Sequence, residues 1–228
     1  MMNKVVAVAI DGPAGAGKSS LSRAVAKELG YIYVDTGALY RTVAYHVTLC
    51  GIGPKDVDGV TRLIDDVNID IQYNDKGEQR MILNGKDVSD EIRTAQMGDY
   101  ASKLSTLKVV RDYLLEVQRG LAKEHSVVMD GRDIGTVVLP KADVKIYMTA
   151  SAEVRAQRRL KEFQEKGDKK STLETVLAEI LQRDERDMNR PIAPLKQAKD
   201  AVLLDTSDLT IEQSKEAIKR IITEKLHR

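Results

Sequence analysis

Residues Gly12 to Ser19 combine glycines, a lysine and a hydroxyl at a spacing that binds phosphate. They match the pattern G-x-x-x-x-G-K-[ST] and read Gly12-Pro13-Ala14-Gly15-Ala16-Gly17-Lys18-Ser19. Glycines let backbone N–H groups converge on a polyphosphate, Lys18 reaches its outer phosphates, and the Ser19 hydroxyl can ligate magnesium. Because the pattern follows an apolar run and opens an amphipathic one, we predict that Gly12 to Ser20 binds ATP or GTP with Mg²⁺.

A phosphate-binding loop alone does not identify the phosphoryl acceptor, so the polar residues that follow the other apolar runs matter. Two such segments are Asp35-Thr36-Gly37-Ala38-Leu39-Tyr40-Arg41 and Asp130-Gly131-Arg132-Asp133. Parallel strands place residues of this kind at the ligand-binding edge of a sheet, where Arg41 can fork onto an acceptor phosphate. Taken alone, each segment is explained equally well by a helix N-cap or a polar turn.

Arginines gather at helical spacing in two later segments. The first set shares a helix face at positions i, i+3, i+4 and i+7 and comprises Arg183, Arg186, Asp187 and Arg190. The second set clusters similarly and comprises Arg155, Arg158 and Arg159. In isolation, either set is better explained as a solvated face with ion pairs. Beside a phosphate cradle, guanidinium groups can instead stabilise the charge on a transferring phosphoryl group. A phosphate acceptor, with a second pKa of about 6, needs no dedicated general base.

Short apolar runs alternate with helical patterns, and these elements must position the polar groups. The runs suit strands buried on both faces and comprise Val5 to Ile10, Tyr31 to Val34, Val127 to Met129, Val144 to Met148 and Ala201 to Leu204. Between them, apolar residues recur on one helix face, as Leu39, Val43 and Val47 do. The alternation predicts an α/β fold of the P-loop NTPase type, with a five-stranded parallel sheet flanked by helices.

Two segments interrupt this alternation. Ile69, Ile71 and Tyr73 alternate with polar residues before Asp75-Lys76-Gly77, which predicts a small antiparallel insertion within about 60–100. Later, the loop at 167–170 separates two helical patterns and predicts a mobile lid at about 155–190, in which Ser171 and Glu174 form a capping box. We expect a single kinase domain over residues 1–228 that includes both segments.

Composition narrows the functional classes. The 36 basic residues nearly balance the 35 acidic ones, so no global field favours nucleic acid or an anionic membrane. The apolar start is too short for a membrane span or a secretory signal, and we expect a cytoplasmic protein. Cys50 stands alone and is expected to be a packing residue. His46, His125 and His227 lack ligand spacing, so no transition-metal site is predicted.

Taken together, these segments resemble the bacterial cytidylate kinases, a family of P-loop nucleoside monophosphate kinases, over nearly the whole chain. The matching segments are Ile10-Asp11-Gly12-Pro13, Asp35-Thr36-Gly37 with Tyr40-Arg41, Ser89-Asp90-Glu91-Ile92-Arg93-Thr94, Asp130-Gly131-Arg132-Asp133-Ile134-Gly135-Thr136-Val137-Val138, and Arg183-Asp184-Glu185-Arg186-Asp187 with Asn189-Arg190. The resemblance implies in-line transfer of phosphate from ATP, with Mg²⁺, to CMP and dCMP. It also implies a monomer whose insertion enlarges the monophosphate-binding region.

The resemblance implies roles on the acceptor side for individual residues. Arg41 and Arg132 resemble residues that hold the monophosphate, while Ser102, Arg111 and Asp133 resemble those that read cytosine. The chemistry agrees with the second assignment. A carboxylate paired with an arginine and a hydroxyl can distinguish the amino donor and the O2 and N3 acceptors of cytosine from the groups of uracil.

Further residues correspond to the sugar and donor sites of the family. Arg183 and Asp187 resemble the sugar-contacting pair, Arg190 resembles another acceptor contact, and Arg158 resembles a lid arginine near the donor nucleotide. Thr36 replaces the serine of many members and keeps the hydroxyl beside the sugar. The cations expected to act in catalysis are Lys18, Arg132, Arg158 and Arg183.

Two alternatives remain open to test. A kinase for AMP, or one shared between UMP and CMP, would hold phosphate similarly, although Asp133 with Arg111 favours cytosine. A regulatory GTPase would carry N-K-x-D for guanine, and Asn84-Gly85-Lys86-Asp87 imitates that motif with the lysine misplaced. The acceptor therefore decides between the enzyme classes.

Overall fold

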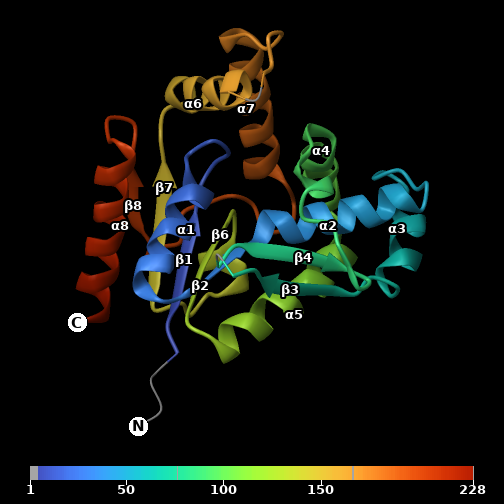
Figure 1. Cartoon of the computed structure of the whole chain (residues 1–228), viewed down its shortest axis with the longest axis horizontal. Coiled ribbons are helices and arrows are strands. Elements are labelled where there is room, and N and C mark those ends of the chain that lie inside the picture. Colours follow the sequence, from blue (N-terminus) through green and yellow to red (C-terminus); the bar gives the residue numbers. More distant parts are fainter. Residues whose placement is uncertain (1–4, 76, 166, 228) are drawn as a thin grey trace.

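A parallel sheet forms the centre of the molecule in the computed structural model, which describes residues 5–75, 77–165 and 167–227 (Figure 1). Within these residues the sheet has five strands in the order β2-β6-β1-β7-β8. Their bounds are β1 (Ala7–Asp11), β2 (Ile32–Asp35), β6 (Val127–Gly131), β7 (Val144–Thr149) and β8 (Val202–Asp205). All neighbouring pairs are parallel. The predicted sheet is confirmed, with each of the five apolar runs contributing one strand.

The central strands are buried on both faces, as their apolar runs predict. In β1, Val8 and Ile10 pack toward α1 (Lys18–Leu29) and α8 (Ile211–Leu226), whereas Ala9 packs toward α5 (Lys108–Glu124). The edge strand β8 is different, because alternate residues face solvent and Leu203 is exposed. The expectation that this run is buried on both faces is wrong, because one face of β8 is open to solvent, whereas β2, the other edge strand, keeps Tyr33 and Val34 buried.

Helix α2 (Thr36–Leu49) begins at the carboxyl end of β2, where the Asp35 side chain accepts the Ala38 N–H as an N-cap. Its apolar face, with Leu39, Val43 and Val47, is buried as predicted. Cys50, just after the last turn, is exposed, so its prediction as a packing residue is wrong.

The insertion forms a small layer beside α2 (Figure 1). It comprises α3 (Val57–Ile64), the antiparallel strands β3 (Ile69–Tyr73), β4 (Gln79–Leu83) and β5 (Lys86–Asp87), a short 3₁₀ turn (η1, Glu91–Arg93) and α4 (Ala95–Leu104). Lys76, in the predicted turn, lies outside the described residues. Met81 and Leu83 share one core with the apolar face of α2, and the Gln79 side chain accepts the Asp35 N–H at 2.9 Å. The insertion is thus fixed to the carboxyl end of β2, beside the predicted acceptor-binding residues Thr36 and Arg41.

The predicted lid consists of α6 (Ala152–Glu165) and α7 (Leu173–Asn189), which stand above the sheet in Figure 1. Ala156, Val176 and Ile180 pack the two helices together. A capping box begins α7, but it is formed by Thr172 and Thr175. The prediction of Ser171 and Glu174 is wrong by one position, because the Ser171 hydroxyl instead donates to Asp168.

None of the helices in the described residues has the length and apolar character needed to cross a bilayer.

Candidate active site

A cavity of about 320 Å³ opens beyond the carboxyl ends of β1, β2 and β6. The loop before α1, the start of α2, helix α4, the end of β6, and helices α6 and α7 all contribute to its wall. Most of the residues singled out from the sequence line it: Ala14 to Ser20, Thr36, Arg41, Ser102, Arg132, Asp133, Arg183, Asp187 and Arg190. Elements that are far apart in the chain therefore bring the predicted phosphate-binding and acceptor-binding residues into one space.

The glycine-rich loop has the geometry of a phosphate cradle. Gly12 passes so close to β7 that a Cβ there would lie 1.9 Å from the Met148 carbonyl oxygen, which only glycine avoids. Among the described residues, no side chain caps the start of α1, where Gly17 adopts the left-handed conformation (φ 85°). The backbone N–H groups of the first turn are therefore left for an anion.

Lys18 spans this loop and is buried. Its Nζ donates to the Pro13 carbonyl oxygen at 2.7 Å. Burial, assisted by the nearby cation Arg132, lowers the pKa of Lys18 well below its usual value. An ammonium held in this way is poised to gain from a bound phosphate, because the anion would compensate the cost of burying the charge.

Ser19 and Asp130 supply oxygen ligands of the kind that Mg²⁺ prefers. The Ser19 hydroxyl donates to Asp130 Oδ2 at 2.9 Å, and the Tyr33 hydroxyl donates to Asp130 Oδ1 at 2.8 Å. Burial raises the pKa of Asp130. Magnesium in nucleotide sites is usually bound through one or two protein oxygens together with phosphates. The donor set fits that ion, and it adds Asp130 to the predicted ligand Ser19.

Two arginines beside the cradle lack part of their hydrogen bonding. The Nε atoms of Arg183 and Arg41 are buried and have no hydrogen-bond partner within the described residues. Burial and the neighbouring Arg132 lower the pKa of Arg183 to about 10. Arg41 donates one Nη2 bond to Asp35 at 3.1 Å. Buried guanidinium donors without partners are costly, so this wall of the cavity is built to receive an anion.

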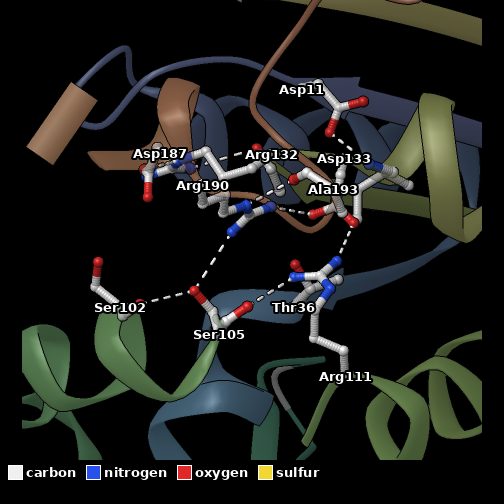
Figure 2. Close-up of polar contacts among 12 residues, drawn as sticks. Asp11, Thr36, Ser102, Ser105, Arg111, Arg132, Asp133, Asp187, Arg190 and Ala193 are labelled. Atoms are coloured by element: carbon white, nitrogen blue, oxygen red, sulfur yellow. Dashed lines mark hydrogen bonds and ion pairs between the residues drawn. The ribbon is translucent and has the colours of Figure 1, made fainter. Parts of the chain in front are cut away.

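Arg132 already has a carboxylate partner. Its Nε donates to Asp187 Oδ2 at 2.8 Å (Figure 2). Burial opposes the charge on Asp187, but Arg132 and Arg183 lower the pKa of this carboxyl below its usual value. Asp187 therefore stays ionised and orients Arg132 at the cavity wall.

Asp133 lies between two guanidinium groups (Figure 2). Arg111 Nη2 donates to Asp133 Oδ2, and Arg190 Nη2 donates to Oδ1 at 2.8 Å. Ser105 joins them, because its carbonyl oxygen accepts from Arg111 and its hydroxyl oxygen accepts from Arg190 at 3.4 Å. A carboxylate offers about four lone-pair positions, so Asp133 can accept one more donor from the cavity. Ser105 was missed in the sequence, although it follows Ser102 at helical spacing.

The remaining hydroxyls have defined partners. Ser102 Oγ accepts from Arg186 Nη1 at 3.2 Å, which leaves its own proton free for an acceptor in the cavity. Thr36 is buried, and its hydroxyl donates to the Asp130 carbonyl oxygen at 2.7 Å. Thr36 thus fastens the start of α2 to the end of β6, in addition to lining the cavity.

The three arginines of α6 have different surroundings. Arg155 is buried, pairs with Asp184 at 2.6 Å and donates to the Ala14 carbonyl oxygen. Arg158 is not part of the cavity wall and donates to Thr206 O at 2.6 Å. Arg159 lines the cavity, and its guanidinium lies 4.8 Å from the centre of the Phe163 ring. The structure thus places Arg159 on the wall, whereas Arg158, which is expected near the donor nucleotide, lies against Thr206.

Replacing Arg155 by methionine is expected to lower the free energy of unfolding by about 3 kcal/mol, since it leaves the buried Asp184 carboxylate without its cation. Urea denaturation of both proteins measures this difference. Arg220→Met is the matched control, because Arg220 is exposed and its ion pair with Glu224 is long, at 3.9 Å. Equal stability of the two variants would contradict the structural role of Arg155.

Comparison with known proteins identifies the family of this chain. The cytidylate kinase family profile matches residues 8–224. A cytidylate kinase from Carboxydothermus hydrogenoformans is 48% identical over 206 residues, covering 90% of this chain and 92% of the relative. One from Caldicellulosiruptor saccharolyticus is 47% identical over 210 residues, covering 92% of each.

A solved structure of an uncharacterized protein from Eubacterium ventriosum shares the fold, with a TM-score of 0.52 at 12% identity over 97% of this chain and 99% of that one. The family profile spans both the phosphate cradle and the Asp133 cluster, which is Asp133 with Arg111, Arg190 and Ser105. On this evidence the chain belongs to the cytidylate kinase family.

Proposed function

We propose that this protein transfers the terminal phosphoryl group of ATP to CMP and dCMP, forming CDP and dCDP by direct in-line transfer. The observation that carries the proposal is that one cavity brings together the phosphate cradle and Asp133 with its arginine partners, with Arg183, whose Nε has no partner among the described residues, on the same wall. Such a space can hold two anionic nucleotides with their phosphates toward each other. Positioning and charge stabilisation supply most of the catalysis in phosphoryl transfer.

On the donor side, ATP places its phosphates on the N–H groups of Gly12 to Ser20. Lys18, already stretched across the loop, binds the outer phosphates. Ser19 and Asp130 would hold Mg²⁺, which would neutralise phosphate charge when it is bound with ATP. Arg183 faces the moving group and stabilises the charge that builds on its oxygens. Arg158, beside Thr206, serves the donor nucleotide outside the cavity wall.

On the acceptor side, Arg41 and Arg132 hold the monophosphate. The Nε of Arg132 stays on Asp187 and Nη1 donates to the Gly131 carbonyl oxygen at 3.3 Å, so Nη2 and the second hydrogen of Nη1 are the donors for phosphate oxygens. Arg183 and Asp187 lie beside the sugar, with Thr36 fixing the backbone beneath it. Arg190 contacts the acceptor while it holds Asp133.

The base is read by complementary donors and acceptors. Asp133 accepts a hydrogen bond from the amino group of cytosine, and Arg111 supports the carboxylate by donating to Oδ2. The Ser102 hydroxyl donates to a ring acceptor, since Arg186 already donates to its oxygen. Uracil presents an oxygen where cytosine has the amino group, so it would face a carboxylate across a repulsive contact.

We further propose that residues 1–228 act as one domain, with the insertion at about 60–100 and the lid at about 155–190. Closing of α6 and α7 over the cavity would exclude water and suppress hydrolysis of ATP. The protein would work as a monomer in the cytoplasm and would not bind nucleic acid.

Arg41→Gln is expected to raise the KM for CMP about tenfold and to change the KM for ATP little, because it removes a charged hydrogen bond to the acceptor phosphate. Initial rates at varied CMP and at varied ATP measure both constants. Arg62→Gln, on an exposed part of α3, is the control. A larger effect on ATP than on CMP would place Arg41 in the donor site.

The test of the proposed reaction is a product analysis. Purified protein with ATP, Mg²⁺ and CMP should form CDP and ADP in equal amounts, as separated by ion-exchange chromatography. Formation of ADP without CDP would indicate an ATPase and would contradict the proposal.

A further inference from the structure

Asp11 is a buried carboxylate at the point where the donor and acceptor sides of the cavity meet. It is the last residue of β1 and is 4% exposed. Its Oδ1 accepts the Ile134 N–H and its Oδ2 accepts the Gly135 N–H, both at 2.7 Å (Figure 2). Asp11 immediately precedes the phosphate cradle, and its two partners immediately follow Asp133. It is not part of the cavity wall, so its effect on the reaction must pass through the backbone.

These two hydrogen bonds hold the chain just after a two-residue segment that leaves the sheet. Asp11 is paired with Gly131 in the β1–β6 ladder, and β6 ends at Gly131. Arg132 and Asp133 then leave the sheet, and the Asp11 carboxylate holds the chain again at Ile134 and Gly135. The two residues that face the acceptor are therefore fixed at both ends, by the sheet on one side and by Asp11 on the other.

We propose that Asp11 is a positioning residue for acceptor selection, which holds Asp133 at the place where it can read the base. The inference rests on the proposed function. It goes beyond the residues that line the cavity, because Asp11 acts through the backbone at Ile134 and Gly135. It also links the two sites, since any displacement of the end of β1 would move the cradle and the base-reading loop together.

A carboxylate suits this role better than a neutral side chain. It presents one acceptor oxygen to each of two successive N–H groups, whereas asparagine would turn its NH₂ group toward one of them. Burial raises the pKa of Asp11 to about 6, and the two backbone hydrogen bonds and Lys18 oppose that rise. The space beside the carboxylate is filled, because a Cβ on Gly135 would lie 3.1 Å from Lys145 Cδ and at an ordinary contact distance of 3.4 Å from Asp11 Oδ2.

The test compares Asp11→Asn with the wild-type protein and with Asp143→Asn. Asp143 is the matched control, since its Oδ2 accepts the Ala7 N–H at 3.0 Å at the opposite end of β1. The measurement is kcat/KM for CMP and for UMP, with the KM for ATP. In Asp11→Asn the ratio of CMP to UMP should fall roughly tenfold, as expected for one disturbed hydrogen bond to a charged group. The control should keep the wild-type ratio.

The ratio separates positioning from folding. A purely structural role would reduce the folded fraction and lower both rates in proportion, so an unchanged ratio in folded Asp11→Asn would overturn the inference. If that variant does not fold, Asp11→Glu keeps the charge but lengthens the side chain, which displaces the backbone at Ile134 and Gly135 and should lower the ratio while the melting temperature confirms folding; an unchanged ratio there would also overturn it. A wild-type protein without CMP kinase activity would instead reject the proposed function.

Discussion

Replacing Lys18 by methionine is expected to lower kcat by about three orders of magnitude while the melting temperature stays unchanged or rises slightly. Methionine fills much of the same space but cannot supply the positive charge that the outer phosphates require. Stability should be preserved because burial lowers the pKa of Lys18, which means that the fold bears a cost to keep this ammonium charged. The lost hydrogen bond to the Pro13 carbonyl oxygen acts in the opposite direction and limits any gain.

Steady-state rates at saturating ATP and CMP, together with thermal melts, measure the two effects. Lys27→Met is the control, because Lys27 is exposed on the same helix. Turnover that survives in Lys18→Met would show that the cradle acts without its lysine. A large fall in melting temperature would show that the buried ammonium is mainly structural.

The second large effect is expected in base selection. Asp133→Asn should reduce the ratio of kcat/KM for CMP to that for UMP about a hundredfold, because the amide can donate to the oxygen of uracil that the carboxylate repels. Asparagine is preferred over alanine for this test. Both substitutions remove the charge that Arg111 and Arg190 share, but asparagine keeps the shape of the side chain and one acceptor oxygen, whereas alanine leaves neither arginine an acceptor at this position.

Rates with both nucleotides at several concentrations provide the ratio. Asp90→Asn is the control, since the Asp90 side chain is 80% exposed in the insertion. An unchanged ratio in the Asp133 variant would remove this residue from base recognition. The effect should also exceed that of Asp11→Asn, because Asp133 would touch the base and Asp11 would act through the backbone.

Local patterns were sufficient to predict most of the fold. Strands buried on both faces appear as continuous apolar runs, so β1, β6 and β7 could be located from these runs alone. The phosphate cradle was equally accessible, because its glycines and Lys18 are consecutive in the chain. The expected burial of β8 was wrong because packing of other elements, and not the apolar run itself, decides which faces of a strand are covered. The prediction that Cys50 is a packing residue was wrong because the apolar pattern of α2 ends just before it.

Long-range contacts were not accessible from the sequence. Asp11 and Ile134 are 123 positions apart, and nothing in either segment indicates that the carboxylate of one accepts the N–H of the other. Arg158 and Arg159 are adjacent and have the same chemistry, yet consecutive helix positions point in different directions. Only the packing of α6 against its neighbours determines that Arg159 faces the cavity. The family resemblance supplied individual roles, but it did not supply the partners that orient these side chains.

The choice of acceptor tests the account most directly. The measurement is kcat/KM with ATP and each of CMP, dCMP, UMP and AMP under identical conditions. The kcat/KM for CMP and dCMP should exceed that for UMP and AMP by about a hundredfold or more. Uracil lacks the amino donor for Asp133, and adenine, which has one, is a larger base without the O2 acceptor of cytosine. A preference for AMP, or equal use of all four nucleotides, would contradict the account.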